Sequence, residues 1–330
     1  MKITKNSTFE EYAKNFFIDS TYTRRQKNRG NILKDATLRF HQTRLRLHLL
    51  PTLGEYKISE LNLALFENTI YALPYSSKTK QCVSSTARII LKELKRDGLI
   101  DFDIEYFEAP KAVSQTPRIL EHKNFNRLFP ENEVAFKGVW RKPDIGIMCA
   151  IMLSAGLRIS EARALLVSDV LKNIPAISIT KQIDQDKRIA PPKAGSTRVV
   201  LIPERTLDMI KSLSSFKQKN KDTLLFPKIK RDGTTRHYTS NEIAIELNYA
   251  VRKARLYYHL TLHALRHSYT TRMNDLFFAS KISNSTELAV LMYFLGHKSE
   301  KITKHYDHGS LFKRTMALCH TTKEIINKFW

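Results

Sequence analysis

The sequence has few cysteines, and they form no recognisable pattern. Its 330 residues include 3 cysteines, Cys82, Cys149 and Cys319, which lie far apart and make no CxxC pair. An odd number of widely spaced cysteines argues against a disulfide framework and against a cysteine-ligated zinc site. We therefore expect a protein of a reducing compartment, namely the cytoplasm.

Long apolar segments are also missing. The first residues, MKITKNSTFEEYAKNFF, contain no apolar run of the kind that a secretory signal carries. The longest apolar stretch, from Ile145 to Leu157, is too short to cross a bilayer and indicates a buried helix. We expect no membrane partner.

Acidic residues are scarce relative to basic ones. Lysine and arginine number 55 against 32 aspartates and glutamates, which gives a formal net charge of +23. The basic excess recurs through both halves of the chain and favours a polyanion, above all nucleic acid, as the partner. A soluble protein with a generally basic surface is the alternative. Because 42% of the residues are hydrophobic, packed cores are expected rather than disorder.

The N-terminal part has the pattern of a small helical domain. Apolar spacing and capping residues predict helices over 7–17, 32–49, 59–73 and 78–97. The polar and basic residues 21–30 predict an exposed connection, and the alternation of apolar and acidic residues over 99–107 predicts an extended segment. This pattern alone indicates no more than a helical binding module.

A polar segment between Pro110 and Pro117 has the composition of a linker, so we place domains at 1–115 and 116–330. In the second domain, 176–180 and 197–202 have strand composition and predict a hairpin. Helices are predicted over 144–153, from 160 onward, and over 204–216, 239–254 and 310–330. The expected fold class is mainly α with a small β-hairpin, an α+β domain.

Two basic residues of the second domain stand where they can meet a phosphate. Arg158 follows a turn at Gly156, where the fold can hold its planar fork, and Glu161 can orient it. Lys193 lies near the tip of the predicted hairpin, from which a lysine can reach into a site. The alternatives are a surface ion pair for Arg158 and a solvated side chain for Lys193.

The segment from Thr261 to Tyr306 carries further polar residues that suggest chemistry on a phosphate. His263 and Arg266 are three apart and share one helical face. His267 has metal-ligand spacing to His263, but HExxH is absent and no cysteine or acidic ligand lies nearby, so we expect no metal.

A histidine and a tyrosine follow in the same segment. His297 stands in LGHKS, and Tyr306 in KITKHYDH has polar neighbours, which predicts a presented tyrosine rather than a structural one.

Together these motifs resemble those of the tyrosine recombinase family, which includes phage integrases and Xer-type recombinases. The residues that carry the resemblance are Arg158 in GLRISEARAL, Lys193 in PPKAGSTRVVLIP, His263 and Arg266 in HALRHSYTTR, His297 in LGHKS, and Tyr306 in ITKHY. More loosely, HLLPTLGEYKISELN resembles the core-binding domain of phage-type integrases. The chain departs from the family in a longer segment between Arg266 and His297, and in having no room for an arm-site-binding domain before its first helix.

The resemblance implies a two-domain DNA clamp, with a helical core-binding (SAM-like) domain at 1–115 and a catalytic domain at 116–330. It implies a site-specific recombinase in which Tyr306 attacks the scissile phosphate and forms a 3′-phosphotyrosyl bond. Arg158 and Arg266 would bind the non-bridging oxygens, and Lys193 would protonate the leaving 5′-oxygen.

The resemblance also gives both histidines a role and names partners. His263 would act as acid and base toward the tyrosine, and His297 would hydrogen-bond the phosphate. No metal and no cofactor are implied. The implied partners are double-stranded DNA recombination sites, a homotetramer on synapsed DNA joined through a C-terminal oligomerisation helix, and accessory DNA-bending proteins. The expected location is the cytoplasm, with the nucleoid, of a bacterium or phage host.

Within this family the segment HLLPTLG favours a mobile-element or phage integrase. The alternatives are a Xer-type resolvase of chromosome dimers, a non-catalytic DNA-binding protein of the same fold, and a relaxase similar to type IB topoisomerases.

Overall fold

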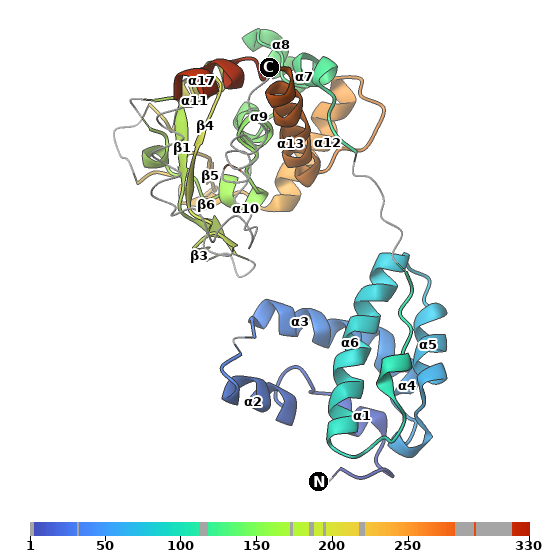
Figure 1. The fold of residues 1–330 in the computed structure, drawn as a ribbon. Coiled ribbons are helices and arrows are strands. Elements are labelled where there is room, and N and C mark those ends of the chain that lie inside the picture. Colours follow the sequence, from blue (N-terminus) through green and yellow to red (C-terminus); the bar gives the residue numbers. More distant parts are fainter. Residues whose placement is uncertain are drawn as a thin grey trace. The chain divides into compact units, whose positions relative to one another are not determined.

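The computed structural model describes residues 3–31, 33–111, 118–171, 174–184, 188–193, 196–217, 222–280, 294 and 319–330. The chain divides into two compact units, Met1–Thr116 and Pro117–Trp330, each of which is considered by itself (Figure 1). The domain boundary that we place after residue 115 lies beside this division. Among the described residues, no helix combines the length and the apolar character that crossing a bilayer requires.

The first unit is built of helices around one apolar core. Its described elements are α1 (Phe9–Ala13), α2 (Thr21–Asn28), α3 (Asp35–Arg44), a π-helical segment η1 (Leu45–Leu49), α4 (Leu50–Leu53), η2 (Ile58–Glu60), α5 (Leu63–Tyr71), α6 (Ser77–Arg96) and η3 (Ile104–Tyr106). Helix α6 buries Val83, Ala87, Ile90 and Leu94, whose spacing of three or four residues gives the helix one apolar face. That face packs into the core beside Phe66 of α5.

Two local predictions for this unit were wrong. The segment 21–30 is largely helix α2 rather than an exposed connection, because Ser20 and Thr23 form a capping box that satisfies free amides at the helix start. The segment 99–107 is not extended throughout, because Ile104–Tyr106 form a helical turn. The Asp103 side chain accepts a hydrogen bond from the Glu105 amide at 3.1 Å and starts the short helix η3 instead.

The second unit is mainly helical and carries three small antiparallel sheets among its described residues, β1 with β4, β2 with β3, and β5 with β6. The expected fold class is thereby confirmed. Its described elements are η4 (His122–Asn124), α7 (Phe125–Leu128), α8 (Glu133–Val139), α9 (Pro143–Ala155), α10 (Ile159–Ala162), η5 (Val167–Asp169), β1 (Ala176–Ile179), β2 (Gln182–Ile183), β3 (Ile189–Ala190), β4 (Arg198–Leu201), α11 (Glu204–Ser212), β5 (Pro227–Ile229), β6 (Thr235–His237), α12 (Ser240–Lys253), α13 (Leu262–Ala279) and α17 (Cys319–Asn327).

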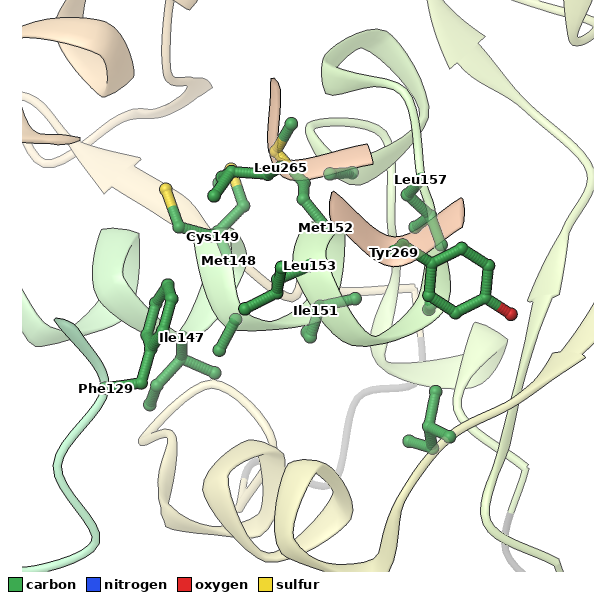
Figure 2. Close-up of a cluster of buried hydrophobic side chains, with 14 of the residues drawn as sticks. Phe129, Ile147, Met148, Cys149, Ile151, Met152, Leu153, Leu157, Leu265 and Tyr269 are labelled. Carbon is green, nitrogen blue, oxygen red and sulfur yellow. The ribbon is translucent and has the colours of Figure 1, made fainter. Parts of the chain in front are cut away.

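Helix α9 forms the centre of the second unit. Every residue from Ile145 to Ala155 is buried, as expected for a helix that is apolar on all sides. Helices α10, α11, α12 and α13 all contact it. Figure 2 shows the side chains of α9 gathered with Leu265 and Tyr269 of α13. The elements that bear Arg158 and Arg266 are therefore fixed against the same core.

The C-terminal residues also pack into the second unit. Ile325 and Ile326 are buried, and the Phe329 ring lies 5.4 Å from that of Phe125 and 5.8 Å from that of Tyr269, measured between centroids. The apolar positions that these residues contribute to the predicted C-terminal helix are thus used within their own unit. The oligomerisation role of that helix stays a prediction, and its first residues, 310–318, lie outside the described part of the chain.

The turn after α9 requires glycine for two reasons. Gly156 has φ +64°, in the left-handed region, and a Cβ there would lie 2.5 Å from Cδ1 of Tyr269. Gly233, in the same unit, has φ +79° with no atom within 4 Å of its virtual Cβ. The two glycines therefore share the backbone constraint but differ in packing.

We expect Gly156→Ala to destabilise the second unit clearly more than Gly233→Ala does. Both changes carry the left-handed backbone cost of about 1–2 kcal/mol, and Gly156→Ala adds overpacking of about 1–3 kcal/mol. The free energy of unfolding can be followed by tryptophan fluorescence in denaturant, because the 2 tryptophans of the chain, Trp140 and Trp330, both lie in this unit. Equal losses would contradict the close packing of Tyr269.

Candidate active site

Arg158 is the N-cap residue of helix α10 and is held by Glu161. Its backbone amide donates to Oε2 of Glu161 at 2.9 Å, and its NH1 donates to Oε1 at 2.9 Å. The Glu161 side chain is 0% exposed, whereas that of Arg158 is 24% exposed. One end of the guanidinium is thus anchored in the protein while part of it stays accessible to a ligand.

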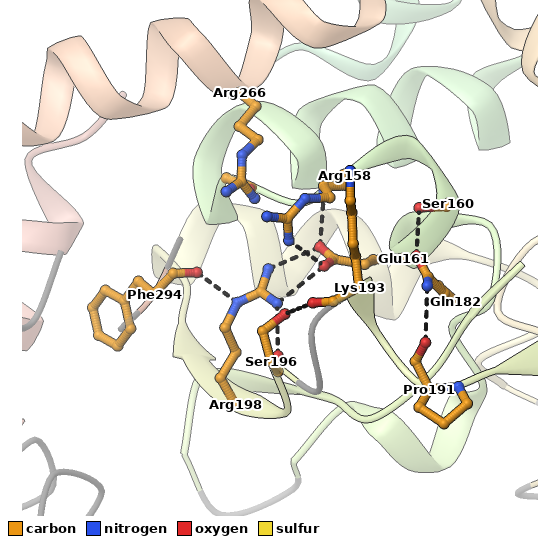
Figure 3. A network of polar contacts seen from close by, with 11 residues as sticks. Arg158, Ser160, Glu161, Gln182, Pro191, Lys193, Ser196, Arg198, Arg266 and Phe294 are labelled. Atoms are coloured by element: carbon orange, nitrogen blue, oxygen red, sulfur yellow. Dashed lines mark hydrogen bonds and ion pairs between the residues drawn. The ribbon is translucent and has the colours of Figure 1, made fainter. Parts of the chain in front are cut away.

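Arg266 reaches the same turn from helix α13. It is buried, and its NH1 donates to the carbonyl oxygen of Gly156 at 2.7 Å. Figure 3 shows its side chain pointing toward the guanidinium of Arg158. Burial, and then the positive charges of Arg158 and Arg198, lower the pKa of Arg266 to about 10. At neutral pH the group is still cationic, and an anion placed between these arginines would relieve their repulsion.

His263 lies one helical turn before Arg266 on α13. Its ring meets that of His267 edge to face, with 4.4 Å between the centroids. Although the side chain is exposed, partial desolvation and then the charges of His267, Arg266 and Arg158 lower the pKa of His263 below its ordinary value of 6.5. The imidazole is therefore mainly neutral at pH 7, the form that accepts a proton.

Lys193 lies in the loop between β3 and β4 and is exposed. The predicted strand pair is confirmed, since β1 pairs with β4 in antiparallel register, and β2 with β3 extends the same connection. Gln182 joins this loop to α10: its Nε2 donates to the Pro191 carbonyl at 2.8 Å, and its Oε1 accepts from Oγ of Ser160 at 3.2 Å. The loop that bears Lys193 is thus tied to the helix that follows Arg158.

Arg198, at the start of β4, is not among the site residues predicted from the sequence. Its NH1 donates to Oε1 of Glu161 at 3.1 Å and its NH2 to Oε2 at 2.8 Å (Figure 3). The side chain is 1% exposed. A signal was present in the sequence, because strand alternation puts Arg198 on the same face as buried Val200, and a buried arginine needs a carboxylate partner.

The structure brings together part of the predicted set. Arg158, Arg266 and His263 lie close enough to affect one another electrostatically, and the loop of Lys193 is tied to α10. His297 and Tyr306 lie outside the described residues. So does half of the long segment between Arg266 and His297, whose first part continues helix α13 to Ala279.

The arrangement is suited to holding an oxyanion. Arg158 and Arg198 bond to the carboxylate of Glu161, and Arg266 feels its charge without a bond to it, so three cations share one anion and the cluster keeps an excess of positive charge. Arginine forks bind phosphate oxygens bidentately, and preorganised donors stabilise charge that develops in a transition state. A neutral imidazole beside them can move a proton.

The chain is similar to known proteins over most of its length. The model of the Phage integrase family matches residues 118–311. Among curated proteins, tyrosine recombinase XerD of Rickettsia bellii is 23% identical over 306 residues, covering 87% of this chain and 92% of that protein. Tyrosine recombinase XerC of Oceanobacillus iheyensis is 23% identical over 248 residues, covering 75% of each.

Solved structures share the fold. The Tn1549 transposon integrase in complex with transposon right end DNA aligns with a TM-score of 0.61 and 18% identity over 90% of this chain and 98% of that one. A lambda integrase dimer bound to a COC′ core site aligns with a TM-score of 0.60 and 14% identity over 87% of this chain and 94% of that one. At these identities the likeness concerns the fold.

We expect the pKa of His263 to lie below 6.5 and to rise in Arg158→Ala, because one of the nearby positive charges is then removed. Since the folded pKa lies below the unfolded one, the stability that neutral His263 contributes is present above pH 6.5 and is lost as the pH falls through the folded value. An NMR titration of ¹³C-labelled histidine, assigned with His263→Gln, measures this pKa. Arg236→Ala is the matched control and should leave it unchanged, whereas a midpoint above 6.5 would contradict the electrostatic description.

Proposed function

The chain belongs to the phage integrase family of tyrosine recombinases, enzymes that cleave and rejoin DNA strands, and we propose that it does so at specific sites through a covalent 3′-phosphotyrosyl intermediate. The observation that carries the proposal is the pair Arg158 and Arg266, which meet at the Gly156 turn with a neutral His263 beside them. The net charge of +23 supports a polyanionic substrate.

The proposed reaction begins at the scissile phosphate. The Tyr306 oxygen attacks the phosphorus and gives its proton to His263. The bond from phosphorus to the 5′-oxygen breaks, and Lys193 protonates that oxygen, which leaves as a free 5′-hydroxyl. Arg158 and Arg266 would bind the non-bridging oxygens, whose negative charge grows during the attack.

The same groups serve the return step. The 5′-hydroxyl of a partner duplex attacks the phosphorus of the phosphotyrosyl ester and gives its proton to Lys193. Tyr306 leaves and takes back a proton from His263, and the strands are rejoined. Because the phosphodiester is exchanged for a phosphotyrosyl ester, bond energy is kept and no further energy source is needed. His297 would donate a hydrogen bond to the phosphate.

The two units would have different functions, DNA binding and catalysis. The first unit, Met1–Thr116, would act as the core-binding domain and the second as the catalytic domain, together closing on the duplex. Helix α3 offers the DNA backbone a cation in Arg44, whose guanidinium lies 5.9 Å from the ring centroid of Phe40, a residue that is 51% exposed. A tetramer on synapsed DNA is proposed by analogy with the lambda integrase tetramer bound to a Holliday junction, which shares the fold with a TM-score of 0.59.

A mobile-element or phage integrase is the role that we favour, on the segment His48–Asn62 and the fold shared with the Tn1549 and lambda integrases. The curated relatives XerD and XerC favour a second candidate, a resolvase of chromosome dimers. The position of the gene separates the two: an integrase gene lies beside an attachment site within a mobile element, whereas a resolvase gene does not.

Tyr306→Phe should bind DNA as the wild type does but form no covalent adduct, because phenylalanine lacks the attacking oxygen. The probe is a labelled duplex, nicked next to the cleaved bond, whose sequence is selected from a random library by binding to the wild-type protein. Denaturing gels count the adduct. Tyr257→Phe is the control, since Tyr257 is 93% exposed in the same unit, and it should react normally. An adduct with Tyr306→Phe would remove Tyr306 as the nucleophile.

Lys193→Ala should keep DNA binding and slow cleavage by about 10²–10⁴-fold, the range for loss of a general acid. Sulfur in place of the bridging 5′-oxygen should restore the rate, because a thiol, with a pKa near 8.5, leaves without protonation. Lys211→Ala, an exposed lysine paired with Asp208, serves as the control and should cleave at the wild-type rate. If binding and cleavage fall together, Lys193 holds DNA rather than donating the proton.

A further inference from the structure

Among the described residues of the candidate site, Arg198 is the most completely enclosed cation. It opens strand β4, opposite Ile179 of β1, and its side chain is 1% exposed. A group with so little accessible surface has no direct route to a DNA phosphate. Its effect on the reaction must therefore pass through the residues that it touches.

The guanidinium of Arg198 is fixed from one side by backbone carbonyls. Its Nε donates to the Phe294 carbonyl oxygen at 2.6 Å, and its NH1 donates to the Ser196 carbonyl oxygen at 3.2 Å. Phe294 is itself 0% exposed. These contacts set the plane of the guanidinium, so its other edge has one direction in which to point (Figure 3).

That other edge holds both oxygens of Glu161. The carboxylate accepts from NH1 and NH2 of Arg198 on one side, and from the amide and NH1 of Arg158 on the other. Burial acts to raise the pKa of Glu161, but hydrogen bonds and charge from Arg198, and then from Arg158, outweigh it and lower the pKa. The carboxylate is ionised, and its rotation is fixed by the planar fork of Arg198.

The charge of Arg198 matters as much as its shape. With Arg158 as its only cationic partner, the Glu161 carboxylate would neutralise the residue that is proposed to bind phosphate. Arg198 shares that negative charge, because it meets both oxygens at 3.1 and 2.8 Å, while Arg158 uses one guanidinium nitrogen at 2.9 Å. Arg158 is thereby oriented without losing its positive charge to the carboxylate.

We propose that Arg198 is a positioning residue for strand cleavage. It holds the Glu161 carboxylate, so that this carboxylate orients Arg158 without neutralising its positive charge. The inference rests on the proposed function, since it assigns Arg158 to the scissile phosphate. It adds a residue that has no contact with DNA to those on which the reaction rate depends.

Arg198→Lys tests this proposal, because lysine keeps the charge but lacks the planar fork. We expect DNA binding to change by less than about threefold while cleavage of the nicked duplex slows on the order of a hundredfold, the effect of misplacing a catalytic group by about 1 Å. Arg236→Lys is the matched control, since Arg236 meets both oxygens of Glu242 at 2.9 and 2.8 Å in the same unit but away from Arg158. The control should cleave at the wild-type rate.

Combination with Arg158→Ala separates positioning from general damage to the fold. If Arg198 acts through Arg158, adding Arg198→Lys to Arg158→Ala should slow cleavage by less than about threefold further, because the route is already broken. A full additional hundredfold loss would show that Arg198 acts by another path and would overturn the proposal. Thermal unfolding is measured on each variant.

Glu161→Gln gives an independent second test, since it keeps the shape of the side chain and removes the charge that both arginines share. The proposal expects slow cleavage with retained binding here too. It is overturned if Arg198→Lys or Glu161→Gln cleaves at the wild-type rate, or if both variants fail to fold, which would make the contact a device for stability alone. If the wild-type protein itself forms no adduct, the proposed function fails instead.

Discussion

The second unit depends on one buried negative charge. Glu161 has no exposed side-chain surface, and its carboxylate is shared between Arg158 at the start of α10 and Arg198 at the start of β4. Burying a charge is costly unless hydrogen bonds and counter-charges surround it, and removing one partner of such a pair costs about 3–5 kcal/mol. The contact that joins a helix to a strand is therefore also the contact that holds the proposed phosphate-binding arginine.

The cations around Glu161 differ in how far they are exposed to solvent. Arg198 is enclosed, Arg266 is buried but bonded to the Gly156 carbonyl, and Arg158 is partly exposed. Lys193 is exposed on a loop. The order follows the work that the proposed reaction requires, since groups that bind a phosphate are best preorganised, whereas a proton donor must reach the leaving oxygen once DNA has arrived.

Features set by local pattern were predictable from the sequence, and features set by distant contacts were not. The apolar run before Gly156 predicts helix α9, and the motifs around Arg158, His263 and Arg266 point to phosphate chemistry. The role of Arg198 was not predicted because its partner Glu161 lies 37 positions away, and neither helical nor strand periodicity indicates such a pairing. Helix α2 was not predicted because its polar and basic composition is also typical of an exposed connection, despite the capping residue Ser20. The placement of His297 and Tyr306 stays a prediction.

The C-terminal residues pack, through Tyr269, against the turn at Gly156. Phe329 lies against the ring of Tyr269, and that ring occupies the space where a Cβ at position 156 would stand. Gly156 in turn presents its carbonyl oxygen to Arg266 and stands two residues before Arg158. Close-packed interiors transmit displacement rather than absorbing it. The last residues of the chain and the turn between the two proposed phosphate-binding arginines are thus parts of one packed wall, so the packing of the C-terminal segment and the geometry of the site are physically coupled.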